Sequence, residues 1–218
     1  MRVIKCSGIA QAYEKGVRYV LGCGAMKHIH GTDVLQADPC VLEIRIDNDN
    51  DHSNLAPLKQ GASGVYRDEF LNPDKGDQPY TYGERLLAYS YDVPNIYGGD
   101  EIKINQLDYI VQTLIDESTS RQAVAIIWNP LKDEEMKEPP CFQYTQAFEN
   151  SEGDLELMFV FRSNAWDMAL QNNLQGLKVF TNEIARRVNK PCYKINLLAV
   201  CPHIYWYNID DIKSKLGL

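Results

Sequence analysis

The sequence lacks the features that mark several classes of protein. None of its six cysteines forms a C-x-x-C pair, which disfavours a zinc ribbon or a thioredoxin-like motif. No apolar run approaches the roughly 18 residues that a membrane span needs, and the first residues lack the apolar stretch of a signal peptide. We therefore expect a cytoplasmic protein with free thiols and no membrane partner.

Positive charge is also scarce. The 218 residues include 22 lysines and arginines against 30 aspartates and glutamates, for a formal net charge of −8. Because a phosphate backbone selects basic surfaces, this balance disfavours a nucleic acid polymer as a partner, although a few arginines can still hold one small phosphate. His28 and His30 have no carboxylate or cysteine at ligand spacing, so we expect no metal.

The apolar pattern predicts a mixture of helices and strands. Helices are expected over residues 8–21, 106–118, 167–188 and 209–216, and strands over 41–46, 122–128, 141–148, 155–161 and 195–200. The strands come in runs without regular alternation with helices. This order favours an α+β fold with one large mixed sheet flanked by helices. The length fits a single domain over residues 1–218.

The stretch "EPPCFQYTQAF" places Cys141 at the mouth of a strand, behind two prolines that stiffen its approach. A cysteine here could be a small buried hydrophobe. Strand alternation instead predicts a polar face with Cys141, Gln143 and Thr145, and a core face with Phe142, Tyr144 and Phe148. A thiol on the polar face would be accessible, and a nearby positive charge would favour its thiolate.

Other polar side chains stand at the ends of predicted strands. Arg162 and Ser163 offer a guanidinium fork and a hydroxyl that suit a phosphate, and Arg121 begins another strand. Each arginine taken alone would more often be a solvated surface charge. His203 and Tyr205 would share one face of a strand, either to bind a sugar hydroxyl or as part of an aromatic cluster.

In their order along the chain, these pieces resemble the thymidylate synthase family. The resemblance covers about residues 80–207 and includes the segment "YTYGERL" (80–86) ahead of Gln106. Its motifs are Ser120-Arg121 before a strand, Pro140-Cys141, Arg162-Ser163, Asn173 eleven residues beyond Arg162, and His203-Ile204-Tyr205. Each motif is weak alone, but five in order at the family's spacing are specific.

The resemblance implies a covalent reaction on a pyrimidine nucleoside monophosphate. Cys141 would add to C6 and make C5 nucleophilic. Tyr82 would hold the water network that helps to remove the C5 proton, and Glu69 is a candidate carboxylate partner by its approximate position. The co-substrate would be 5,10-methylene-tetrahydrofolate or a related tetrahydropterin such as methylene-tetrahydromethanopterin.

The resemblance also implies the contacts that hold the nucleotide. The 5′-phosphate would be bound by Arg121, Arg162 and Ser163, and the 3′-hydroxyl by His203 and Tyr205. In the family one such arginine crosses from the partner subunit, so a homodimer is expected. The amide of Asn173 would read the base, and its donor and acceptor match N3–H and O4 of uracil.

The sequence departs from the family pattern at several positions, some of which concern the pterin and some the phosphate. Ala165 stands where the family has an aspartate that helps to bind the folate ring, with Asp167 two residues later, and Phe142 replaces the usual histidine. Gln122 replaces a second phosphate arginine, the segment "KHIHGT" (27–32) replaces the N-terminal phosphate arm, and the C-terminal closing segment is missing. This short form is similar to compact archaeal thymidylate synthases and to phage-type pyrimidine hydroxymethylases.

Three hypotheses follow. The first is C5 methylation of dUMP to dTMP. The second is 5-hydroxymethylation of dUMP, dCMP or CMP, in which water quenches the exocyclic methylene; the missing closing segment favours it, whereas Asn173 favours a uracil base. The third is a catalytically idle nucleotide-binding relative, which the presence of Cys141 and Arg162 disfavours.

Overall fold

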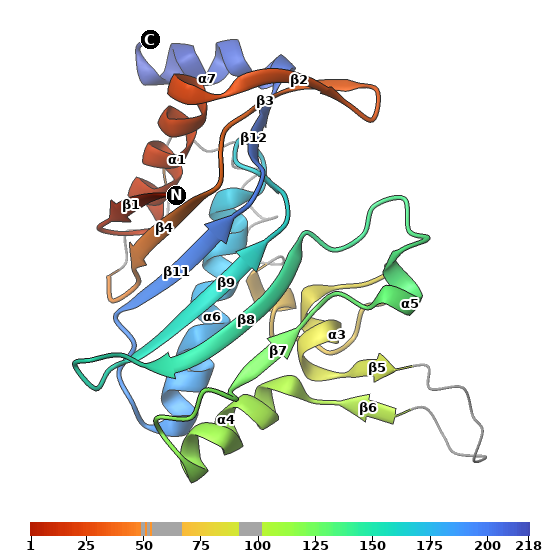
Figure 1. The fold of residues 1–218 in the computed structure, drawn as a ribbon, viewed down its shortest axis with the longest axis vertical. Helices are drawn as coiled ribbons and strands as arrows, with labels where there is room; N and C mark the ends of the chain where they lie inside the picture. The colour runs from red at the N-terminus through yellow and green to blue at the C-terminus, as the bar shows by residue number, and fades with distance from the viewer. Residues whose placement is uncertain (49–50, 52, 54–66, 92–101) are drawn as a thin grey trace.

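A six-stranded mixed sheet forms the centre of the protein (Figure 1). The computed structural model describes residues 1–48, 51, 53, 67–91 and 102–218. The strand order is β1 (Arg2–Cys6), β4 (Cys40–Arg45), β11 (Lys194–Ala199), β9 (Leu155–Phe161), β8 (Phe142–Glu149) and β7 (Val124–Ile126). The β1–β4 and β11–β9 pairs are parallel, and the other pairs are antiparallel. The predicted α+β class with a mixed sheet is confirmed.

Three helices cover one face of this sheet: α1 (Ile9–Cys23), α4 (Gln106–Asp116) and α6 (Leu170–Val188). In Figure 1 helix α6 runs behind the strands. Alternate strand residues such as Leu42, Leu157 and Leu197 point at the helices and are fully buried, as are Leu174 and Leu177 on α6. Every second residue of the strands and one face of each helix are apolar, and these surfaces pack together into one continuous apolar core.

A smaller four-stranded sheet stands at one end of the large one. Its order is β10 (Asn164–Ala165), β12 (Pro202–Tyr205), β3 (Thr32–Gln36) and β2 (Ala25–Ile29). The hairpin between β2 and β3 turns at His30 and Gly31, whose φ angles of 49° and 81° suit a two-residue turn of the kind that fits the twist of a hairpin. This sheet carries the segment "HIY" on β12.

Short elements complete the described chain. A third, two-stranded sheet pairs β5 (Tyr89–Tyr91) with β6 (Ile102–Ile104). Further helices are α3 (Tyr82–Leu87), α5 (Pro130–Asp133), the 3₁₀ turn η1 (Trp206–Asn208) and α7 (Ile209–Leu216). In the part of the chain that the structure describes, no helix is both long and apolar enough to cross a membrane.

Most predicted long elements appear with shifted ends. The predicted strand 122–128 shortens to β7, and the helix predicted from 167 begins at Leu170, after a turn. The predicted faces of β8 hold at its start, where Phe142 is fully buried and Gln143 is not, but are wrong beyond it. A bulge between Phe142 and Tyr144 shifts the alternation, so Thr145 is fully buried while Tyr144 and Phe148 are half-buried on the opposite face.

Candidate active site

The predicted nucleophile lies where two antiparallel strands end together. Cys141 directly precedes β8 and Arg162 directly follows β9. The pairing of Phe142 with Phe161 brings the two residues side by side, and the amide of Arg162 donates to the carbonyl oxygen of Cys141 at 2.9 Å. The predicted thiol and the predicted phosphate ligand are therefore neighbours.

The side chain of Arg162 holds the proline segment that leads to Cys141. Its Nε donates to the oxygen of Pro140 at 2.9 Å and its Nη2 donates to the oxygen of Pro139 at 2.6 Å. Gln143 donates from Nε2 to the same Pro140 oxygen at 2.6 Å. A guanidinium carries five N–H donors, so this half-buried side chain keeps further donors for an anion.

The thiol of Cys141 is half-buried, and burial raises its pKa. The positive charge of Arg162 lowers the pKa and the carboxylate of Glu138 raises it, but burial is the largest influence. Arg162 thus favours the thiolate, as expected, without outweighing desolvation. The thiol was also predicted to be accessible at the start of the strand, and it is only partly exposed.

Tyr82 contacts the peptide that follows the nucleophile. It is the first residue of α3, whose N-cap Thr81 accepts from the amide of Glu84 at 3.0 Å. The Tyr82 hydroxyl oxygen accepts from the amide of Phe142 at 3.4 Å, and the two rings meet edge to face at 5.5 Å. This packing fixes the hydroxyl one residue from Cys141.

A cleft of about 380 Å³ opens beside Tyr82. Its lining combines carboxylates, aromatic rings and small polar groups: Glu69, Phe70, Gln78, Pro79, Tyr80, Thr81, Tyr82 and Glu138. The turn that carries Glu69 packs directly on α3 at Gly83, where a Cβ atom would lie 1.9 Å from the Glu69 carbonyl oxygen. Glycine at this position therefore allows the approach that brings Glu69 to the cleft.

The small sheet brings the remaining polar groups to the same edge of the molecule. His203 on β12 pairs with Ala165 on β10, and its Nδ1 lies 3.5 Å from the Ser163 hydroxyl. The same nitrogen lies 3.1 Å from the carbonyl oxygen of Cys201, and this contact fixes the orientation of the ring. The rings of His203 and Tyr205 meet edge to face at 5.4 Å.

Asp167 holds the end of β12 in place. Its Oδ2 accepts from the amide of Tyr205 at 3.1 Å and from Nδ2 of Asn208 at 2.7 Å. Asp167 is 1% exposed, its Oδ1 has no hydrogen-bond partner among the residues that the structure describes, and burial raises its pKa. Asp167 thus supports the predicted sugar-binding strand from inside the protein and does not line the cleft beside Tyr82.

Asn173 lies in the second turn of α6 and is 4% exposed, whereas its neighbour Asn172 is half-buried. The helix therefore turns the predicted base-reading residue, and not its neighbour, toward the interior. Its buried amide needs hydrogen-bond partners.

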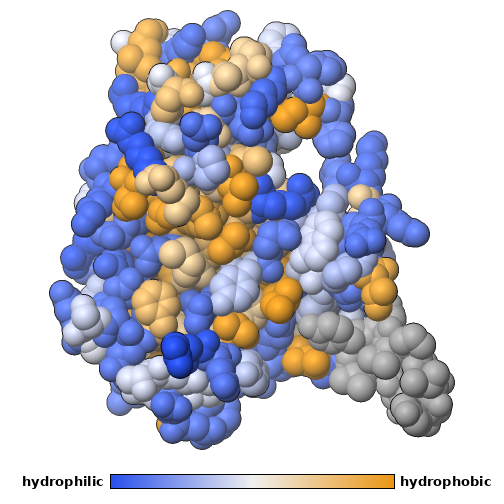
Figure 2. All heavy atoms as spheres, viewed as in Figure 1, coloured by the Kyte–Doolittle hydropathy of each residue, from blue (hydrophilic) through white to orange (hydrophobic). Residues whose placement is uncertain are grey.

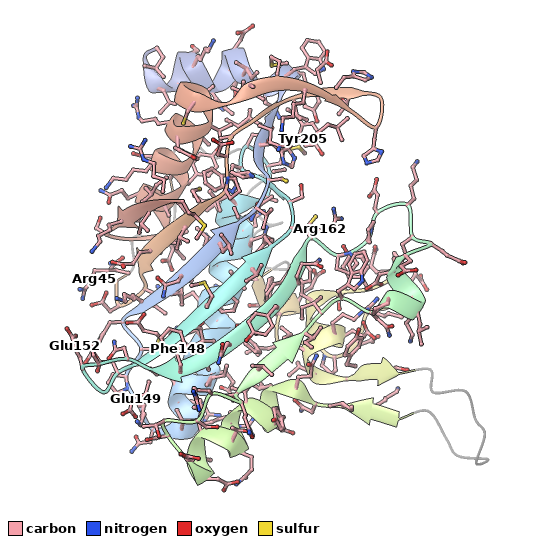
Figure 3. All side chains as sticks on the ribbon, viewed as in Figure 1. Arg45, Phe148, Glu149, Glu152, Arg162 and Tyr205 are labelled. Carbon is pink, nitrogen blue, oxygen red and sulfur yellow. The ribbon has the colours of Figure 1, made fainter. Side chains whose placement is uncertain are left out.

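Arg121 does not join the other residues within this chain. Its carbonyl oxygen accepts from Nε2 of Gln146, and its side chain is exposed beyond the start of β7. This is the end of β8 that carries Glu149, about 26 Å from Cys141 for eight residues of strand. Figure 3 shows Phe148 and Glu149 at one end of β8 and Arg162 beside the other.

The edge shared by the two sheets can support one class of chemistry. A thiol is held beside a guanidinium, a hydroxyl and an imidazole, next to a cleft with carboxylates. Such a set suits nucleophilic attack on a substrate that is anchored by an anionic group.

The comparison with known proteins identifies the family. The thymidylate synthase family model matches residues 48–217, so the chain belongs to the thymidylate synthase family, as the sequence motifs predicted. A protein of Methanosarcina barkeri, named provisionally as a thymidylate synthase, is 31% identical over 98% of this chain and 94% of its own length. A similarly named protein of Methanocaldococcus jannaschii is 36% identical over 68% of this chain and 65% of its own length.

Some residues of the site are not evident from the sequence. Glu138 and Tyr80 line the cleft, and Tyr80 is packed so that burial raises its pKa to about 12. Both lie within segments that the motifs mark, three residues before Cys141 and two before Tyr82. The i, i+2 spacing of Tyr80 and Tyr82 could have indicated that Tyr80 also lines the cleft. Nothing in the sequence indicated that Asp167 supports β12.

Proposed function

We propose that this protein transfers a one-carbon unit from a methylene-tetrahydropterin to C5 of dUMP and forms dTMP. The observation that carries the proposal is the contact between Cys141 and Arg162 at the paired ends of β8 and β9. It supports a single pose in which an anchored phosphate directs the pyrimidine ring to the thiol.

Each side chain then has a defined task. The Cys141 thiolate adds to C6, and the electron pair of the C5–C6 bond moves toward O4 and leaves C5 nucleophilic. Arg162 and Ser163 bind the 5′-phosphate, while Nε2 of His203 and the Tyr205 hydroxyl bind the 3′-hydroxyl. Ser163 and His203 lie side by side, which supports these assignments, because the two residues together can contact the 5′-phosphate and the 3′-hydroxyl of one nucleotide.

Proton removal and base recognition are assigned to two further residues. The Tyr82 hydroxyl, beside the Cys141–Phe142 peptide, orders the water that accepts the C5 proton. Asn173, buried on α6, reads the uracil edge. Glu69 lines the cleft next to Tyr82 and supplies a carboxylate to the same water network.

The cleft beside Tyr82 fits a pterin. Its flat aromatic and proline surfaces suit a fused ring, and the carboxylates of Glu69 and Glu138 match the N–H donors of a pyrimidinone edge. We assign to these two carboxylates the ring-binding role of the aspartate that the family has at the position of Ala165. When bound, a methylene-tetrahydropterin, whether folate or methanopterin, supplies the one-carbon unit.

A second candidate reaction is 5-hydroxymethylation of dUMP, dCMP or CMP. It is favoured by one observation, that Glu69 and Glu138 line the cleft beside the nucleophile and Glu138 is exposed to solvent. A wet, acidic cleft admits water to the exocyclic methylene, whereas a closed apolar cleft favours hydride transfer to that carbon.

We infer further that the site is completed by a second copy of the chain and that residues 1–218 form one domain. The sheet face opposite the helices carries Met158, Val160 and Leu198, half-buried, and Val3 and Ile126, 54% and 47% exposed. Figure 2 shows these strands as an apolar area on the face turned to the viewer. A homodimer through this face would bury it and supply Arg121 to the partner's phosphate site.

Product analysis tests the proposal. The protein is incubated with methylene-tetrahydrofolate and, in turn, dUMP, dCMP and CMP, with Cys141→Ala as the control. The expected result is dTMP from dUMP and no product with Cys141→Ala. A 5-hydroxymethyl product would support the second reaction instead, and nucleotide binding without any product or C5-proton exchange would support a catalytically idle relative.

A further inference from the structure

A buried ion pair lies behind the cleft, away from the residues assigned so far. Arg85 on α3 is 3% exposed and Asp133 at the end of α5 is fully buried. Two contacts join them: Nη2 of Arg85 lies 2.7 Å from Oδ1 of Asp133, and Nη1 lies 3.3 Å from Oδ2. The guanidinium therefore meets the carboxylate as a fork, the geometry that fixes orientation as well as distance.

Both partners are also bound to the backbone around them. The Oδ2 atom of Asp133 accepts from the amide of Asn129 at 2.7 Å, which closes the short helix α5 on itself. Nη1 of Arg85 donates to the carbonyl oxygen of Ile127 and to the Tyr89 hydroxyl, each at 3.2 Å. The pair therefore joins α3 to the chain that leaves β7 and forms α5.

The two joined segments lead to different residues of the candidate site. The Arg85 guanidinium lies 5.7 Å from the ring centre of Tyr80, which lines the cleft, and Tyr82 precedes Arg85 by one helical turn. Asp133 precedes Cys141 by eight residues, in the segment that also carries Glu138. One ion pair thus relates the position of the two tyrosines to that of the thiol.

The energetics favour a geometric role for this pair. Removing two charges from water costs most of what their attraction returns, so a buried ion pair adds little stability compared with an apolar pair of the same size. Helices α3 and α5 have six and four residues, too few to hold a position by themselves. A directional contact between them defines their relative placement, which apolar packing alone would define less sharply.

We propose that Arg85 and Asp133 are positioning residues for the one-carbon transfer, holding Tyr80 and Tyr82 in register with Cys141. This inference rests on the proposed function. It concerns the alignment of the reacting groups and not the affinity for the nucleotide, because Arg162, Ser163 and His203 lie on other elements.

The test is the double variant Arg85→Met with Asp133→Leu, which removes both charges and preserves apolar volume. We expect a lower melting temperature, because the amide of Asn129 loses its acceptor and the carboxylate of Glu84, 3.3 Å from Nε of Arg85, loses its cation, but a Kd for dUMP close to that of the wild type. The rates of C5-proton release and of product formation should fall about ten- to a hundredfold, as for a small misplacement of reacting groups. The rate at which iodoacetamide alkylates Cys141, followed on its peptide by mass spectrometry, should change as well.

Two further variants keep the test decisive. Glu183→Leu with Arg186→Met removes a partly exposed ion pair on α6, an element other than α3 and α5, and should alter none of these rates. Arg85→Lys keeps the buried charge but not the fork; it should fold even where the double variant does not, and should lose rate in the same way. A folded double variant with wild-type turnover and alkylation would overturn the proposal.

The alkylation measurement separates this inference from the proposed function. A wild-type protein that releases no C5 proton from any nucleotide refutes the assigned reaction. The effect of the Arg85 and Asp133 variants on Cys141 alkylation would still decide whether the pair positions the thiol.

Discussion

At the scale of single residues, the ionisation of Cys141 is set by a competition that the structure makes explicit. Burial raises the pKa of the thiol, Arg162 opposes the shift, and Glu138 adds to it. Since the thiolate is the reactive form, the balance controls how much nucleophile is present near neutral pH. Glu138 is exposed and can be changed without disturbing the core.

We expect Glu138→Gln to lower the pKa of Cys141, because it removes a negative charge that disfavours the thiolate. Alkylation of Cys141 should then be faster at neutral pH, and its rate should level off at a lower pH than in the wild type. The measurement is the pH dependence of the iodoacetamide rate. Glu135→Gln, in the same exposed segment, is the matched control, and an identical profile in Glu138→Gln would contradict the assigned influence.

Asp167 gives a pH-dependent prediction on stability. Because burial raises its pKa in the folded state, the stability due to its neutral form is fully present below the ordinary value of 3.8 and is lost as pH rises through the folded-state pKa. Asp167→Asn stays neutral and can still accept from the Tyr205 amide. Its urea midpoint should exceed that of the wild type at pH 7, and the difference should shrink toward pH 4. A difference that is constant with pH would exclude this origin.

At this scale the sequence could identify the chemical groups but not their states. Cys141, Arg162, Ser163 and His203 stand at strand ends, so motif spacing was enough to propose that they meet. The structure pairs Cys141 with Arg162 and places Ser163 beside His203. The raised pKa of Cys141 depends on burial, which spacing does not report. The isolated position of Arg121 likewise depends on which end of the β7–β8 pair it occupies.

At the scale of secondary structure elements, the long amphipathic segments were predictable and the short ones were not. Helices α4 and α6 repeat their apolar positions over several turns, which is enough to define a buried face. Strands β2, β3, β5 and β6 have three to five residues and are fixed by their partners in a sheet. The bulge in β8 inserts one residue, and a single insertion exchanges the two faces of every later position.

Helix α6 also positions the cleft, through Gly176. A Cβ atom there would lie 2.2 Å from Cδ2 of Phe70, the buried ring next to Glu69. Gly176→Ala should therefore destabilise the protein by about 1–3 kcal/mol through overpacking, reduced by about 1 kcal/mol of helix propensity. It should also reduce turnover by displacing Glu69.

Gly22 in α1 is the matched control for Gly176, because nothing lies within 4 Å of the Cβ atom that an alanine would add there. Gly22→Ala should leave turnover unchanged and raise stability by up to about 1 kcal/mol. Urea unfolding and initial rates of both variants decide the matter. Equal stability changes in the two variants would mean that Phe70 moves aside without cost.

At the scale of the whole molecule, the position of Arg121 supports the proposed dimer. Arg121 and Cys141 lie at opposite ends of β8, so one chain cannot place both on the same phosphate and pyrimidine. The apolar outer face of the sheet offers a surface for a second copy. In a dimer with twofold symmetry, each chain would contribute its Arg121 to the site of the partner.

Mixing two inactive variants tests this arrangement. Arg121→Ala lacks the shared arginine and Cys141→Ala lacks the nucleophile, so each alone should have little or no activity. After joint unfolding and refolding, half of the dimers are mixed, and each mixed dimer has one site with both residues intact. The expected recovery is about a quarter of wild-type activity per chain for a twofold dimer. If Arg121 acts within its own chain, every site in the mixture lacks one of the two residues, and no activity should return.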